Sequence, residues 1–168
     1  MISFETSCSE LSSSFFLRGN KNGLSGEENC VAIRADFPIP EQCGLFYFEV
    51  DIIDIGQNGK IGIGFCTKSA GLNKMPGREY FSWGYHGGDG RIFFNSRIGK
   101  PYGPKFMTGD TIGCCLNFRN NMVFYTRNGV NLGIAFRNLE KALYPCVGIL
   151  SPGGTVGANF GYRKFKYT

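Results

Sequence analysis

Residues 83–90 read WGYHGGDG, and the chain continues through PYGP at 101–104 and TGDTIGCC at 108–115 to NGVNLGIAF at 128–136. The stretch alternates apolar runs with turns rich in glycine and asparagine, which is the pattern of short strands joined by tight connections. It carries almost none of the side chains that catalysis needs. It therefore predicts an elaborate β framework that holds something, and not a framework that makes or breaks bonds.

Alternation of apolar and polar residues extends this pattern in both directions along the chain. Residues 46–53 alternate in this way, which predicts a half-buried strand whose outward face carries the solvated acids Glu49 and Asp51. The pair Asn58-Gly59 is a hairpin signal in front of the next strand. Further strands are predicted at 61–65, 112–119, 122–127, 130–136, 147–150 and 156–160.

The strand pattern also predicts the core and the fold class. Residues 130–136 alternate with strict period two, so Ile134 is expected in the core with Phe124. Truncation of either side chain is then expected to destabilise the protein by roughly 2–5 kcal/mol. The only stretch that is compatible with a helix, 138–143, is too short for more than a turn or two. The sequence therefore predicts an all-β, antiparallel sandwich of two stacked sheets about 10 Å apart, with little helix.

The bulk composition fits one domain with a substantial core. The chain has 168 residues, of which 42% are hydrophobic and 18% charged, and it contains 25 glycines and 16 phenylalanines. These numbers suit short strands with aromatic rings between the sheets. Residues 1–14 are rich in serine and are expected to form a flexible lead-in. Residues 15–168 are expected to form a single, monomeric domain, because no linker or repeat divides them.

Several features report on the compartment and the partner. No apolar run approaches the roughly 18 residues of a transmembrane helix, and residues 1–8 do not resemble a signal peptide. Seven cysteines without framework spacing predict free thiols in a reducing compartment, the cytoplasm or the nucleus.

The net charge is −5 over residues 1–60 and +10 over residues 61–168. If the basic residues share one edge they favour an acidic partner, although scattered, solvated Lys and Arg side chains would explain the same count.

The order of the motifs resembles that of the SPRY domain family. The shared motifs are WGYHGGDG at 83–90, Gly109-Asp110, Asn128-Gly129, Leu143-Tyr144-Pro145 and Asn159-Phe160-Gly161. Within this family, the sequence most resembles the Ran-binding protein M-like branch. The motifs that it shares with this branch are RADFPIP at 34–40, YFEV at 47–50, MPG at 75–77 and PYGP at 101–104. The resemblance covers residues 15–162, which is nearly the whole expected domain.

The resemblance implies a bent β-sandwich of the concanavalin-like jelly-roll type that binds short segments of partner proteins through loops at one rim. Full-length members of this branch are scaffold subunits of a multisubunit ubiquitin ligase. Similar domains of cyst nematodes are secreted effectors that act in the cytoplasm of plant host cells. The chain departs from the branch at Gly88, where Asp is usual, and in the acidic residues Asp51 and Asp54. It also ends just after the resembling region, so we expect an adaptor-like binding role without ligase-scaffold activity.

Two loops are candidate partner-binding segments because of their own composition. Residues 72–78 place Met75, an adaptable apolar contact, between the charged residues Lys74 and Arg78. Residues 151–154 contain two consecutive glycines, whose bare backbone allows a partner to approach closely.

The family resemblance adds the loop at 18–21, Thr67 and Phe93 to the same rim. The candidate partner-binding residues are Arg18, Asn20, Lys21, Thr67, Lys74, Met75, Arg78, Phe93, Pro152 and Gly153. Binding of a peptide by a rigid scaffold needs such an apolar anchor site with a few polar groups around it. We expect Phe93→Ala or Met75→Glu to abolish partner capture without unfolding the domain.

The main alternative is a carbohydrate-binding or glycoside-cleaving sandwich that uses Glu49 and Asp51. Sandwich glycosidases present two carboxylates from one strand, about 5.5 Å apart in retaining enzymes. The two acids share a face at period two, whereas Asp54 falls on the opposite face. An outward row of solvated acids explains the same residues without catalysis.

Other kinds of chemistry have weaker support. His86 is the only histidine, and in a glycine-rich turn such a ring commonly hydrogen-bonds the backbone. No Cys-x-x-Cys pair suggests a metal site, and residues 84–90 open no helix that could cradle a phosphate. Basic residues cluster tightly only at 163–166, so a nucleic-acid groove is not expected. We therefore expect a protein partner, and no cofactor, metal, nucleic acid or membrane.

Overall fold

The computed structural model describes residues 15–19, 30–140 and 142–168 of the chain. The expected lead-in at 1–14 and the candidate residues Asn20 and Lys21 lie outside the described residues. The described chain forms twelve strands and a single 3-10 turn at Glu41–Cys43.

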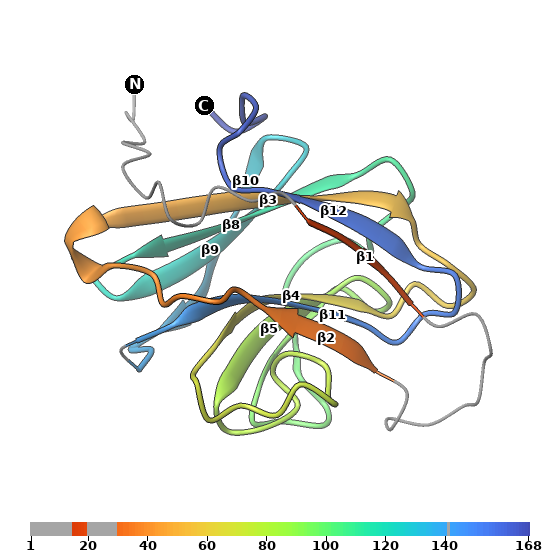
Figure 1. Ribbon diagram of the computed structural model, residues 1–168, viewed down its shortest axis with the longest axis horizontal. Coiled ribbons are helices and arrows are strands. Elements are labelled where there is room, and N and C mark those ends of the chain that lie inside the picture. The colour runs from red at the N-terminus through yellow and green to blue at the C-terminus, as the bar shows by residue number, and fades with distance from the viewer. Residues whose placement is uncertain (1–14, 20–29, 141) are drawn as a thin grey trace.

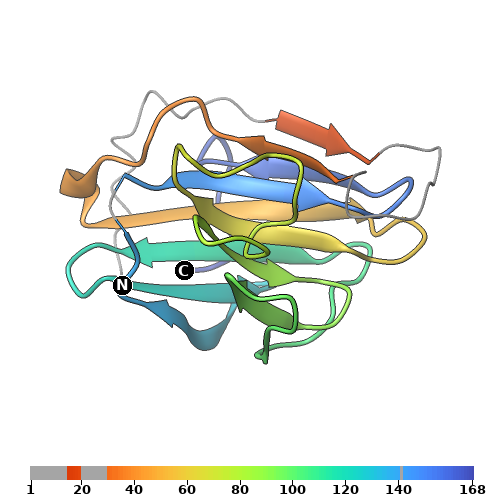
Figure 2. The ribbon, with the colours of Figure 1, turned by 90° about the horizontal axis from the view of Figure 1, so that it is seen from below.

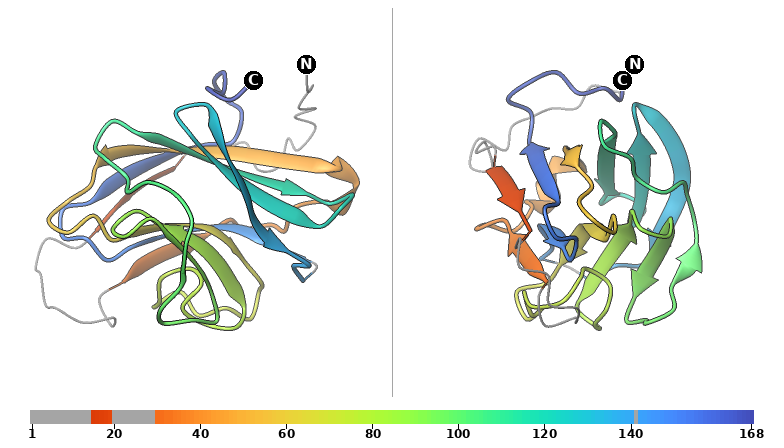
Figure 3. Two further views of the ribbon diagram at one scale, coloured as in Figure 1. Left: turned by 180° about the vertical axis from the view of Figure 1, so that it is seen from behind. Right: turned by 90° about the vertical axis from the view of Figure 1, so that its right-hand side faces the viewer.

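The strands form two six-stranded sheets that lie face to face (Figures 1 and 3). The first sheet has the order β1 (Phe15–Arg18), β12 (Thr155–Asn159), β3 (Leu45–Asp54), β8 (Thr111–Asn117), β9 (Met122–Arg127) and β10 (Val130–Arg137). The second sheet has the order β2 (Val31–Arg34), β11 (Tyr144–Ile149), β4 (Ile61–Cys66), β5 (Ser82–His86), β6 (Arg91–Phe94) and β7 (Lys100–Pro101). All neighbouring strands are antiparallel. The predicted all-β sandwich of two stacked sheets is confirmed, and every predicted strand range overlaps an observed strand.

The core lies between the two sheets and is built from alternate residues of their strands. Phe48 and Val50 of β3 are 0% exposed, and the ring of Phe48 lies 5.8 Å from that of Phe65 in β4 of the other sheet. Tyr125 of β9 is also fully buried, and its hydroxyl donates a 2.9 Å hydrogen bond to the carbonyl oxygen of Ile63 in β4. This bond satisfies a hydroxyl that would be costly to bury alone, and it links the two sheets.

The outer face of the second sheet is covered by residues 67–81, the connection between β4 and β5 (Figure 2). The strands beneath this loop carry glycine where it approaches most closely. A Cβ atom on Gly62 would lie 3.0 Å from the side chain of Met75, and one on Gly84 would lie 2.4 Å from the carbonyl oxygen of Pro76. The missing side chains therefore allow the loop to lie directly on the sheet.

The outer face of the first sheet is covered by residues 163–168, which turn back over it after β12 (Figure 1). Strand β3 is therefore buried on both faces, and Tyr47 and Glu49 on its outer side are 5% and 0% exposed. The predictions of a half-buried strand and of a solvated Glu49 are wrong. The cause is a contact with a segment more than a hundred residues away, which a local pattern does not reveal.

Strand β10 departs from the period-two pattern that its sequence predicts. Its pairing with β9 shifts register between Asn131 and Ile134 and again before Phe136, and Gly133 has a φ of 94°. These bulges leave Ile134 45% exposed, so the prediction that it lies in the core is wrong.

Phe124 also lies outside the core between the sheets. Its neighbours Val123 and Tyr125 take the inward positions of β9, and Phe124 is half-buried on the outer face, with its ring 5.7 Å from that of Tyr167. The described part of residues 138–143 contains no helix, and Asn138 has a positive φ of 56°.

Candidate functional site

A pocket lies at the end of the second sheet where β4 begins and β5 ends. Its volume is about 180 Å³. Its wall is formed by Asn58, Lys60, Lys74, Met75, Arg78, His86, Gly88, Asp89 and Leu150. These residues come from the connections β3–β4 and β4–β5, from the end of β5 with the connection to β6, and from the residue after β11, so four distant segments build one pocket. The pocket is smaller than the roughly 300 Å³ of a drug-sized site, and its size suits about one large side chain.

One wall of the pocket is fixed by Ser151, which is 1% exposed. Its hydroxyl donates a 2.6 Å hydrogen bond to the carbonyl oxygen of Ile55 and accepts bonds from the backbone N–H groups of Asn58 and Gly59. The side-chain amide of Asn58 in turn donates to the carbonyl oxygen of Leu150 at 3.3 Å. A single buried hydroxyl therefore holds two turns in a fixed relative position.

The floor of the pocket is uncharged. The ring of His86 stacks on Phe93 at 4.0 Å, and its Nε2–H donates a 2.6 Å hydrogen bond to the carbonyl oxygen of Pro76. Burial lowers the pKa of His86 to about 4, so the ring is neutral at physiological pH. The guanidinium of Arg78 lies 4.5 Å from the centre of the Phe93 ring and donates to the carbonyl oxygen of Arg97. The hydrogen bond to Pro76 confirms the interpretation of His86 as a ring that hydrogen-bonds the backbone.

The rim of the pocket is cationic. Lys60, Lys74 and Arg78 contribute three positive charges, against one negative charge from Asp89. Lys60 and Lys74 are exposed to solvent, whereas Arg78 is half-buried against the floor. A positive rim above a neutral floor favours an acidic group in the ligand.

Six of the ten candidate partner-binding residues lie at this end of the sandwich. They are Arg18, Lys74, Met75, Arg78, Pro152 and Gly153. The three from loop 67–81 line the pocket itself. The connection after β11 adjoins its wall, because the N–H of Gln57 donates to the carbonyl oxygen of Pro152 at 3.0 Å. Strand β1 ends beside this connection, where the N–H of Gly19 donates to the carbonyl oxygen of Gly154. A role of these residues in binding stays a prediction.

Two other candidate residues do not line the rim. Thr67 follows the end of β4 that is opposite to Lys60, and it is 7% exposed. Phe93 is 1% exposed, and it supports the pocket from beneath Arg78. Its burial predicts that Phe93→Ala lowers the free energy of unfolding by roughly 3–5 kcal/mol, so a loss of binding in this variant would not by itself identify a contact with the partner. Met75 is only 5% exposed, so Met75→Glu would bury a charge.

Six residues of the pocket were not predicted as site residues from the sequence. They are Asn58, Lys60, His86, Gly88, Asp89 and Leu150. The predicted hairpin at Asn58-Gly59 is wrong, because the turn joins β3 of the first sheet to β4 of the second. The glycines at 62 and 84 gave a usable signal, since bare positions in two adjacent strands mark the place where a loop lies on a sheet.

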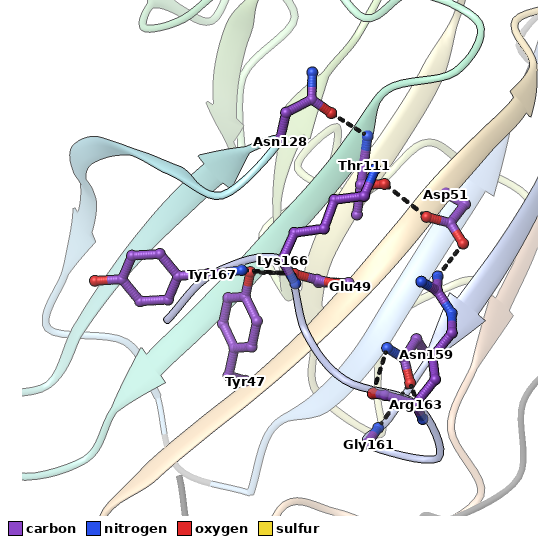
Figure 4. Close-up of polar contacts among 10 residues, drawn as sticks. All are labelled: Tyr47, Glu49, Asp51, Thr111, Asn128, Asn159, Gly161, Arg163, Lys166 and Tyr167. Atoms are coloured by element: carbon purple, nitrogen blue, oxygen red, sulfur yellow. Dashed lines mark hydrogen bonds and ion pairs between the residues drawn. The ribbon is translucent and has the colours of Figure 1, made fainter. Parts of the chain in front are cut away.

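The two acids of the carbohydrate alternative do not face an open cleft (Figure 4). Glu49 is fully buried, and its Oε1 accepts hydrogen bonds from the Tyr47 hydroxyl at 3.0 Å and from the Lys166 backbone N–H at 2.8 Å. Asp51 forms an ion pair with Arg163. A sugar could contact Glu49 only after the C-terminal residues had moved away.

Within the described ranges, no three His, Cys, Asp or Glu side chains are grouped closely enough to hold a metal ion. The same part of the chain contains no helix whose length and apolar character would allow it to cross a membrane. Among the described residues, Cys30, Cys66, Cys114, Cys115 and Cys146 are free thiols.

Comparison with known proteins identifies the family. A family model described as the SPRY domain matches residues 45–163, which run from β3 to just beyond β12 and include strands of both sheets. The chain belongs to the SPRY domain family. The resemblance that its motifs suggest is thereby confirmed.

Curated relatives of this SPRY domain are Ran-binding proteins. The Ran-binding proteins 9/10 homolog of Drosophila melanogaster is 53% identical over 152 residues, which are 90% of this chain and 16% of that protein. Human Ran-binding protein 9 is 49% identical over 140 residues, or 83% of this chain and 19% of that protein. The Ran-binding protein M homolog of Arabidopsis thaliana is 36% identical over 135 residues, which are 80% of this chain and 29% of that protein. The chain thus spans less than a third of the length of these relatives.

Solved structures show the same sandwich. A crystal structure of a human SPRY domain superposes with a TM-score of 0.74 at 29% identity, over 84% of this chain and 90% of that one. The SPRY domain of human HERC1 superposes with a TM-score of 0.68 over 89% of this chain and 90% of that one. At 21% identity, the second comparison supports the fold alone.

Proposed function

We propose that this SPRY domain is a non-catalytic protein-interaction module that captures a short acidic segment of a partner protein at the pocket. The observation that carries the proposal is the charge of the site, in which Lys60, Lys74 and Arg78 surround an uncharged, buried floor. A carboxylate in the pocket would accept charge-assisted hydrogen bonds from these three side chains. The apolar part of the same ligand side chain would contact Met75.

The rigidity of the pocket supports a role in capture. Its walls are fixed by the buried Ser151 hydroxyl and its floor by the hydrogen bond from His86 to Pro76, so little order must be created when a ligand binds. A pocket for one side chain gives limited affinity by itself. We propose that the flanking residues of the segment lie along Pro152 and Gly153, which adjoin the wall.

Reversing one charge of the rim gives the most direct test of this site. We expect Lys74→Glu to weaken the binding of acidic peptides about tenfold, because attraction is replaced by repulsion at a cost of about 1.4 kcal/mol. Lys74 is exposed, so the fold should be unaffected. The measurement is binding to an array of acidic, neutral and basic nine-residue peptides, followed by titration of the best binders.

The matched control is Lys68→Glu, which reverses an exposed lysine at the opposite end of β4. It should leave peptide binding unchanged. The proposal is wrong if the peptides selected by the natural protein show no acidic bias, or if Lys74→Glu and Lys68→Glu bind them equally well.

The non-catalytic nature of the site is part of the proposal. It is supported by the state of Glu49, whose carboxylate lies beneath residues 166 and 167 and is 0% exposed. A reducing-sugar assay and a glycan array should both be negative. Turnover of a polysaccharide that Glu49→Gln abolishes would establish the carbohydrate alternative instead.

The setting in which the module acts is also a proposal. The free thiols fit a reducing compartment, the cytoplasm or nucleus of its own cell or the cytoplasm of a host cell if the protein is an effector. An adaptor role in a ubiquitin ligase would use the same pocket to recruit a protein. The names of the relatives describe them as Ran-binding, so Ran belongs among the proteins to be tested.

A further inference from the structure

The C-terminal residues 163–168 lie on the outer face of the first sheet like a bound peptide (Figure 4). The ring of Tyr47 in β3 contacts two aromatic residues at alternate positions of this segment. Phe165 meets it edge-on at 4.9 Å, and Tyr167 lies 5.6 Å away. Tyr167 also packs against Phe124 of β9 at 5.7 Å. The side chains of residues 165 and 167 therefore contact the sheet, as anchor residues of a bound peptide do.

The backbone of the segment is held by one buried carboxylate. Oε1 of Glu49 accepts the N–H of Lys166 at 2.8 Å and the next N–H, that of Tyr167, at 3.2 Å. The Tyr47 hydroxyl donates to the same oxygen at 3.0 Å. Bonds to an ionised acceptor are about twice as strong as neutral ones. Because two of the three donors are consecutive backbone groups, Glu49 recognises a bent main chain at Lys166 and not a particular side chain.

The sheet leaves room for this arrangement at two glycines. A Cβ atom on Gly113 of β8 would lie 2.0 Å from the Tyr47 hydroxyl, and one on Gly129 would lie 2.6 Å from the carbonyl oxygen of Lys166. Both contacts are too short to exist, so a side chain at either position would displace the anchor or the segment. Arg163 fixes the start of the segment through its ion pair with Asp51.

Glu49 also retains an unused acceptor. Its second oxygen, Oε2, is buried and has no hydrogen-bond partner among the described residues. A buried carboxylate oxygen without a donor is costly, so the segment that now fills the site does not satisfy it completely. The family model ends its match at residue 163, so the rest of the segment lies beyond the matched SPRY region.

We propose that the outer face of β3 and β9 is a second peptide-binding site, filled here by residues 163–168, and that this segment can be exchanged for an identical one from a second copy of the chain. The required ligand is a segment with an arginine followed by aromatic residues two and four positions later. The site lies on the opposite sheet from the acidic-peptide pocket, so both can be occupied together. The exchange is independent of the proposed function of that pocket.

The test uses the full chain and a fluorescent peptide with the sequence of residues 161–168. In the natural protein the attached segment competes with the peptide at a high effective concentration. The double variant with Phe165→Ala and Tyr167→Ala keeps the chain length but removes both ring contacts. It should bind the peptide at least about tenfold more tightly than the natural protein does. Adding Glu49→Gln to the double variant should weaken this binding about tenfold, while Lys74→Glu should not change it.

Amide hydrogen exchange in the natural protein gives an independent result. The amides of Lys166 and Tyr167 should exchange at least about tenfold more slowly than that of Lys164, and excess unlabelled peptide should accelerate them. The proposal is overturned if these amides exchange as fast as in a free peptide. It is also overturned if the double variant, shown to be folded by circular dichroism, binds no peptide, or if excess peptide leaves the exchange rates unchanged.

Discussion

Replacing Phe48 by alanine is expected to lower the free energy of unfolding by about 4 kcal/mol. The side chain is 0% exposed and lies between the sheets. Its ring stacks with Phe160 at 5.4 Å and meets Phe65 of the other sheet edge-on at 5.8 Å. Removing it leaves a cavity that the surrounding rigid strands cannot close. The measurement is equilibrium unfolding in urea, with the slope checked for two-state behaviour.

Phe37→Ala is the matched control, because this phenylalanine is 55% exposed. It should change the free energy of unfolding by less than about 0.5 kcal/mol. Ile134→Ala should also have a small effect, since the bulges of β10 leave this side chain 45% exposed. A loss of more than about 2 kcal/mol in either control, or less than about 2 kcal/mol for Phe48→Ala, would contradict the position of the core.

The sequence was sufficient to predict the fold class because individual strands and some of their turns follow local signals. The alternation around Phe48 and Val50 identified β3 and its inward face, and both residues are completely buried. The Asn128-Gly129 turn between β9 and β10 has positive φ at both residues, as a tight hairpin of this kind requires. The alternation of apolar and polar residues and the residue types of a turn are properties of neighbouring positions, so both can be recognised without coordinates.

The outer faces of the sheets could not be predicted in the same way. Polar residues such as Glu49 on an outward face are expected to be solvated, but in this protein residues 163–168 cover Glu49. The pocket has the same origin, because loop 67–81 folds back over the second sheet and brings Lys74 and Arg78 beside Lys60. Such contacts join segments far apart in the sequence. Only the glycines on the covered faces of the sheets indicate these contacts in the sequence itself.

The two covered faces differ in what they make available to a partner. On the second sheet the covering loop builds a pocket between itself and the strands, so the covered face still presents an open site. On the first sheet the covering segment buries Glu49, which a partner could contact only by displacing that segment. Binding at the pocket therefore requires no rearrangement, whereas binding at the outer face of β3 competes with a segment of the same chain.

Acidification from pH 7 to pH 5 is expected to lower the free energy of unfolding by about 2 kcal/mol through His86 alone. Burial lowers the pKa of this ring to about 4 in the folded protein, against about 6.5 in an unfolded chain. Between these values the unfolded state binds more protons, so falling pH favours unfolding. The contribution of His86 is fully present above pH 6.5 and is lost progressively as the pH falls towards 4.

Because His86 is the only histidine in the chain, this dependence can be assigned to one residue. In the His86→Gln variant the amide can still donate to the carbonyl oxygen of Pro76, but it does not titrate. Urea unfolding at pH 5, 6 and 7 should show the loss in the natural protein and a nearly flat profile in the variant. An equal slope in both proteins would assign the effect to carboxylates. In the folded protein the ring stays neutral until the pH approaches 4, so acidic-peptide binding by the folded protein should not change through His86 between pH 7 and 5.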